Sequence, residues 1–168
     1  MTNLFLDARP RAWALAALVW AALAAGPAGA AEKPSSKGVK EVLEKADTFE
    51  LYSLDPGPRQ VANGFHGWKV LGKTPVKDAA ARKRIIAAVY KGLADSDGTV
   101  ANCFNPRHGI RATHKGKTVD LVICFECLQV QIHADKKEAT ELTTASPQPT
   151  LDKVLKDAGV PLAKKAGK

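Results

Sequence analysis

The sequence predicts a small α+β domain, with an antiparallel sheet of about four strands in two hairpin-like pairs and helices packed on one face. Three observations support this prediction. Segments rich in strand-forming residues alternate with segments whose apolar residues recur at helical spacing. Turn-forming residues separate most of these segments. The resulting order of helix, two strands, helix, two strands and helix is most simply satisfied by four antiparallel strands under a layer of helices.

The N-terminal residues 1–30 are predicted to be a secretory signal peptide. A positively charged start is followed by an uncharged apolar run over residues 12–25 and by small residues at 28–30. The apolar run is shorter than the roughly 20 residues that span a bilayer. We therefore expect cleavage after Ala30, no membrane span in the mature chain, and a location in the periplasm or outside the cell.

The rest of the chain is predicted to hold one domain. Residues 31–37 are polar and are expected to form a flexible leader, residues 38–162 the single α+β domain, and residues 163–168 a disordered basic tail. The net charge is +8, but the basic residues are scattered and no aromatic residues alternate with them. This pattern is typical of a solvent-exposed charged surface with a basic tail and argues against nucleic-acid binding, and loose attraction to an anionic envelope or polymer is the alternative. The expected partner is an unidentified envelope or extracellular one.

The first half of the domain predicts two helices and two strands. A short helix capped by Ser36 precedes a strand over Thr48–Leu54. A second strand is predicted over Phe65–Leu71, ended by Gly72. Asp78 then introduces the clearest helix, over Ala79–Ala94. Its apolar stripe consists of Ile85, Val89 and Leu93, with Ile86 alongside.

The second half predicts a hairpin that turns at Gly116. The first arm covers residues 103–114 and the second residues 118–133. Apolar residues of the second arm occupy odd positions up to Phe125 and even positions from Leu128. A regular strand cannot change phase in this way, so we expect a β-bulge or kink at Phe125–Cys127.

The C-terminal part of the domain predicts one more helix. Residues 135–149 are polar and contain two prolines, which indicates a connection without regular structure. Thr150 is expected to cap a helix over Leu151–Ala158, and Gly159 is expected to end it.

All three cysteines, Cys103, Cys124 and Cys127, lie in the predicted hairpin. A disulfide is the default in an exported protein because the compartment is oxidising. The hairpin register favours a Cys103–Cys127 bond first and a Cys103–Cys124 bond second, with the remaining cysteine as a small buried apolar residue.

Two further interpretations of the same cysteines remain open. Together with His108 they would form a Cys₃His set for zinc, which is the only cofactor that the sequence suggests. Alternatively, the Cys124–Phe–Glu–Cys127 motif would carry out thiol–disulfide exchange, although its flanks are strand-like and redox motifs of this type usually begin a helix.

Arg107 and His108 follow Asn105–Pro106, so they are expected at the tip of a loop. A structural role, in which Arg107 donates hydrogen bonds to exposed carbonyl groups, is favoured there, and an anion-binding pair of Arg107 and His108 is the alternative. Glu126 is a candidate ion partner for Arg107. No Ser/His/Asp ordering, carboxylate pair or nucleotide-binding glycine pattern is present. The sequence therefore identifies no catalytic residue and favours a binding or structural module over an enzyme.

The segments that begin CFNPRHGIR at Cys103 and end VDLVICFEC at Cys127 resemble a pattern in uncharacterised small exported bacterial proteins. The resemblance covers about a quarter of the mature chain, and it implies a common grouping without implying a mechanism. The prediction is therefore an exported binding or structural module with a cysteine-anchored hairpin. A zinc-binding or thiol-redox protein is the alternative.

Overall fold

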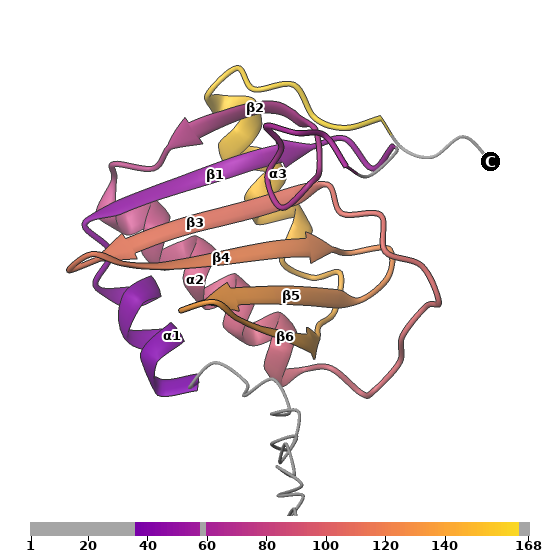
Figure 1. Ribbon diagram of the computed structural model, residues 1–168, viewed down its shortest axis with the longest axis horizontal. Helices are drawn as coiled ribbons and strands as arrows, with labels where there is room; N and C mark the ends of the chain where they lie inside the picture. The colour runs from indigo at the N-terminus through magenta and orange to yellow at the C-terminus, as the bar shows by residue number, and fades with distance from the viewer. Residues whose placement is uncertain (1–35, 58–59, 165–168) are drawn as a thin grey trace, which may run out of the picture.

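The computed structural model describes residues 36–57 and 60–164, which form a six-stranded antiparallel sheet and three helices (Figure 1). The helices are α1 (Ser36–Glu44), α2 (Ala79–Ala94) and α3 (Gln148–Asp157). In sheet order the strands are β2 (Val70–Pro75), β1 (Thr48–Leu54), β3 (His108–His114), β4 (Lys117–Cys124), β5 (Gln129–Ala134) and β6 (Lys137–Leu142). The α+β class is confirmed, and the sheet is larger than the four strands predicted.

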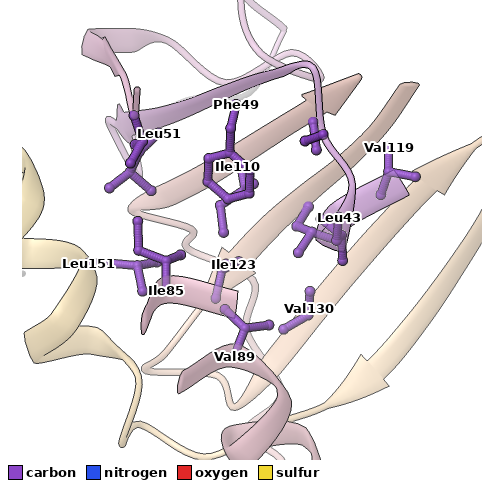
Figure 2. Packing of buried hydrophobic residues seen from close by; sticks show 14 of the residues in the cluster. Leu43, Phe49, Leu51, Ile85, Val89, Ile110, Val119, Ile123, Val130 and Leu151 are labelled. Atoms are coloured by element: carbon purple, nitrogen blue, oxygen red, sulfur yellow. The ribbon is translucent and has the colours of Figure 1, made fainter. Parts of the chain in front are cut away.

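The three helices pack on one face of the sheet and bury the main core against it (Figure 1). Ile85 and Val89 of α2 and Leu151 of α3 lie opposite strand residues such as Leu51 and Ile123 (Figure 2). All five side chains are buried. Burying one such aliphatic side chain contributes about 1.5–3 kcal/mol, so this layer is the main source of stability.

The other face of the sheet is partly covered by the connection between β1 and β2. A smaller apolar cluster there consists of Tyr52, Leu54, Phe65, Trp68 and Val122. The ring of Phe65 stacks on that of Tyr52, with centroids 4.4 Å apart. Gly109 permits this contact, because a Cβ at its position would lie 2.7 Å from Phe65 Cε1.

Two elements have the predicted bounds. The strand predicted over Thr48–Leu54 is β1, and the helix predicted over Ala79–Ala94 is α2. Asp78 caps α2, since its carboxylate accepts hydrogen bonds from the backbone N–H groups of Ala80 and Ala81.

The prediction of a strand over Phe65–Leu71 was wrong. Phe65 and Trp68 instead exchange two backbone hydrogen bonds across a tight turn at His66 and Gly67. Both turn residues have positive φ, 50° and 81°, which is the geometry of a two-residue hairpin turn. The strand β2 starts only at Val70 and continues past Gly72 to Pro75.

The predicted second arm, residues 118–133, is two strands rather than one. The chain turns over residues 125–128, between β4 and β5, and Cys124 pairs with Gln129. A reversal of direction explains the phase change in the apolar pattern, so the predicted bulge was wrong. Leu128 completes the turn with a φ of 56°.

The remaining corrections concern the ends of elements. Part of the predicted connection 135–149 is the edge strand β6, reached through a turn at Asp135 and Lys136, both with positive φ. Thr150 lies inside α3 and does not cap it, because the helix begins at Gln148 after Pro147. Ser36 is the first residue of α1, so the helix includes the last two residues of the predicted leader.

The predicted signal peptide 1–30 and most of the leader lie outside the described residues, as do residues 165–168 of the predicted tail. Within residues 36–57 and 60–164, no helix combines the length and the apolar character required to cross a membrane.

Candidate functional site

The turn between β4 and β5 brings two cysteines together. It places the Cα atoms of Cys124 and Cys127 5.2 Å apart, and their sulfurs lie at disulfide distance. The predicted bond from Cys103 to Cys127 or to Cys124 is therefore wrong, because the structure has the Cys124–Cys127 pair instead. The physical reason is the turn: residues i and i+3 face opposite ways in a straight strand and approach each other where the chain reverses.

The third cysteine lies beside this pair. Cys103 belongs to the loop between α2 and β3, and its Sγ is 3.1 Å from Cys127 Sγ. That loop and the β4–β5 turn meet at the same end of the sheet (Figure 1). The fold therefore gathers all three sulfurs into one group, which we call the cysteine cluster (Cys103, Cys124 and Cys127).

The members of the cysteine cluster differ in their access to solvent. Cys124 and Cys127 are fully buried, whereas Cys103 is exposed and carries a free thiol. A reagent in solution can therefore reach the Cys103 sulfur directly, and it can reach the buried pair only through movement of the chain or through Cys103.

Backbone N–H groups point at the buried sulfurs. The Asn105 N–H donates to Cys124 Sγ at 3.4 Å and to Cys127 Sγ at 3.2 Å. The Cys127 N–H also donates to Cys124 Sγ, at 3.1 Å. Hydrogen bonds of this type favour the charged form of an acceptor, so they would stabilise a thiolate at Cys124 more than a neutral thiol.

His108 does not join the cysteine cluster. It pairs with Ile123 across the β3–β4 ladder, so it lies on the helix face of the sheet, whereas Cys124 lies on the other face. Its Nε2 is 2.8 Å from Asp152 Oδ1 of α3. In the described residues, no group of three or more His, Cys, Asp and Glu is arranged to hold a metal ion.

Arg107 and His108 line a pocket between the start of β3 and α3. Arg107 Nη1 is 2.7 Å from Glu126 Oε2, the ion pair that the sequence suggested. The His108 hydrogen bond lowers the pKa of Asp152 despite the opposing effect of partial burial. The two residues therefore share a pocket, but both are buried and not at an exposed loop tip.

A row of charged side chains crosses the face of the sheet that lacks helices, and the sequence analysis did not identify it. The cross-strand neighbours in this row are Glu50, Arg111, Asp120, His133 and Glu138. Buried Asp120 accepts hydrogen bonds from Arg111 and lies 2.7 Å from His66 Nε2. One signal was available, because Asp120 interrupts the apolar run of β4.

Comparison of the chain with protein-family models, with curated proteins and with solved structures found no match.

Proposed function

We propose that the chain is an exported thiol–disulfide exchange protein whose reactive centre is the cysteine cluster. The observation that supports this proposal most directly is the 3.1 Å separation between the free thiol of Cys103 and the disulfide-paired Cys127 Sγ. A third sulfur at this distance is in position to attack the disulfide, which is how disulfides are transferred.

The internal step conserves electrons and needs no added oxidant. The Cys103 thiol loses its proton, and the thiolate attacks Cys127 Sγ. The new Cys103–Cys127 bond forms as the Cys124–Cys127 bond breaks, and the bonding pair leaves on Cys124 as a thiolate. The two N–H groups that donate to Cys124 Sγ are positioned to stabilise that leaving group.

The internal step moves the disulfide from two buried residues to a pair that includes an exposed one. A substrate dithiol can then attack Cys103 Sγ, which forms a mixed disulfide and releases Cys127 as a thiolate. The second substrate thiol attacks the mixed disulfide, so the substrate leaves oxidised and Cys103 becomes a thiol. The substrate loses two electrons and two protons, and the protein gains them.

A purely structural role for the disulfide is the alternative, in which it fastens the β4–β5 turn of a binding module. The two roles differ in what they require of Cys103. Exchange needs Cys103 to bond with Cys127, whereas a structural clamp needs only Cys124 and Cys127.

The test uses the variant Cys124→Ser in an oxidising glutathione buffer. Because Cys127 then loses its partner and Cys103 Sγ lies 3.1 Å away, we expect a Cys103–Cys127 disulfide to form within the monomer. Thiol counting under denaturing conditions and mass spectrometry of the cleaved chain measure it. Two titratable thiols in a folded Cys124→Ser protein would contradict the proposal.

The matched control is Cys127→Ser, which removes the sulfur that both bonds share. Exchange predicts that this variant forms no disulfide within the monomer under the same buffer, and mass spectrometry distinguishes an internal bond from glutathione attached to the exposed Cys103. A third variant, Cys103→Ser, is expected to retain the Cys124–Cys127 pair and to lose the reaction with substrate dithiols.

A further inference from the structure

A pocket of about 940 Å³ lies beside the β4–β5 turn, and none of the three cysteines lines it. Its walls come from the start of β3, the turn, α3 and the segment after α3. The lining includes Arg107, His108, Glu126, Asp152, Lys156 and Leu162. No proposed step of the cysteine chemistry uses this space.

Arg107 is a buried cation in the wall of the pocket, and one nitrogen of its guanidinium lacks a hydrogen-bond partner. Only 10% of its side chain is exposed. Nη1 contacts Glu126, Nε donates to the carbonyl oxygen of Lys164 at 3.3 Å, and Nη2 is buried without a hydrogen-bond partner. A buried donor without an acceptor costs free energy, so a planar anion that engaged both Nη atoms would be favoured.

Glu126 is a carboxylate that a ligand can replace. Its side chain is 44% exposed, and it forms an ion pair with Arg107. A half-exposed carboxylate gives up little when it returns to water, because exposed ion pairs contribute about 0–1 kcal/mol. The position of Glu126 shows where a carboxylate can pair with Arg107. Glu126 pairs with Nη1 only, so Nη2 has no hydrogen-bond acceptor.

The other pocket acids are already paired, so they do not compete for Arg107. Asp152 is held by His108 at 2.8 Å, and Asp157 is held by Lys153 at 2.8 Å. Lys156 adds a second positive charge on the helix wall. The remaining lining is largely apolar and includes Ala145, Pro149, Leu162 and Ala163.

We propose that this pocket binds a ligand with a single carboxylate on an apolar body, and that the ligand carboxylate replaces Glu126 on the Arg107 guanidinium. The apolar body would lie against the walls around Leu162. The proposal goes beyond the exchange chemistry and does not depend on it, since no cysteine takes part.

The test compares benzoate with its neutral analogue benzamide on the full chain, by calorimetry and by NMR of the Arg107 Nε–Hε group. We expect benzoate to bind and to shift the Arg107 signal, and benzamide to do neither. Glu126→Gln removes the competing charge, so benzoate should bind about fivefold more tightly. Arg107→Lys keeps the charge and loses the planar fork, so binding should weaken at least about tenfold.

The control variant is Glu138→Gln, which removes a carboxylate that is half exposed on β6, away from the pocket, and should leave binding unchanged. Equal binding of benzamide and benzoate would overturn the proposal. Unchanged benzoate affinity in a folded Arg107→Lys protein would also overturn it. If inorganic phosphate binds to Glu126→Gln and benzoate does not, the assignment to a carboxylate is wrong.

Discussion

Asp120 links two side chains on the face of the sheet that lacks helices, because it contacts both Arg111 and His66. Its side chain is 7% exposed, and it receives hydrogen bonds from Arg111 Nε at 2.8 Å and Nη2 at 2.6 Å. His66 adds a third contact, and the His66 ring stacks on that of His133 with centroids 3.8 Å apart. Burial alone would raise the pKa of Asp120, but the contacts with Arg111 and His66 outweigh it and lower the pKa.

The substitution Asp120→Asn should therefore destabilise the fold in a pH-dependent way. At pH about 7 we expect a loss of about 1–3 kcal/mol in the free energy of unfolding, because Arg111 keeps only a neutral acceptor. A lowered folded pKa gives stability that is present above the unfolded value of about 3.9 and is lost as pH falls through the folded pKa. The difference between wild type and variant should thus shrink below pH about 4.

Urea unfolding at the two pH values measures this effect. A variant as stable as wild type at pH about 7 would contradict the account, and so would a difference that stays constant on acidification.

At the scale of elements, the connection between β1 and β2 is positioned by close packing of one of its side chains against the sheet. Phe65 lies over Gly109 of β3, where a Cβ would sit 2.7 Å from Phe65 Cε1 and 2.9 Å from its Cδ1. The same connection carries His66, which contacts Asp120. The position of this loop is therefore tied to a strand that is distant in the sequence.

Gly109→Ala should displace the Phe65 ring and destabilise the protein by about 1–3 kcal/mol, the usual cost of overfilling a packed site. Thermal or urea unfolding gives the value. The matched control is Gly57→Ala in the same loop, where the nearest atom to the new Cβ is a side-chain oxygen of Asp55 at 3.2 Å. An equal effect of the two substitutions would show that the close packing on Gly109 does not matter.

The elements that the sequence predicted correctly carry strong local signals. The helix Ala79–Ala94 combines an apolar stripe with the Asp78 cap, and β1 is a continuous run of strand-forming residues. Local pattern and tertiary packing favour the same structure in both cases, so the bounds could be read from the chain itself.

The elements that the sequence missed have weak or misleading local signals. The β4–β5 turn contains Phe125, Glu126 and Leu128 and has no Gly, Pro or Asn, so its reversal depends on tertiary pairing. The edge strand β6 has one buried residue and is largely polar, so its sequence resembles that of a connecting loop. The tight turn at His66 and Gly67 interrupts an apolar run that looks like a strand.

The candidate site could be predicted as a set of residues but not as a geometry. The three cysteines, Arg107 and His108 are close together in the sequence, and the charges of Arg107 and Glu126 suggest the ion pair that the structure contains. The placement of Cys124 and His108 on opposite faces of the sheet depends on the register of β3 against β4, which local sequence does not determine.

At the scale of the whole molecule, two candidate sites lie near the β4–β5 turn. The cysteine cluster lies at one end of the sheet, and the pocket around Arg107 lies on the helix side of the same β4–β5 turn. Glu126 and Cys127 are adjacent in that turn. When the Cys124–Cys127 bond is replaced by a Cys103–Cys127 bond, we therefore expect the position of the Glu126 carboxylate relative to Arg107 to change.

The same coupling gives a prediction for ligand binding. Locking the disulfide as Cys103–Cys127 with Cys124→Ser frees the β4–β5 turn from its clamp. We expect benzoate to bind more tightly to this variant than to wild type, because Glu126 is then held less firmly against Arg107. Calorimetry measures the change, and an unchanged affinity would show that the two sites are independent.

The most direct test of the central claim is to locate the free thiol of the wild-type chain. The protein is equilibrated in glutathione buffer, quenched with acid and alkylated, and cleavage after Arg107 and Glu126 places the three cysteines on separate peptides. Exchange within the cluster predicts that the label divides between Cys103 and Cys124 and that Cys127 stays unlabelled. Label on Cys103 alone, with no Cys103–Cys127 peptide, would contradict the account.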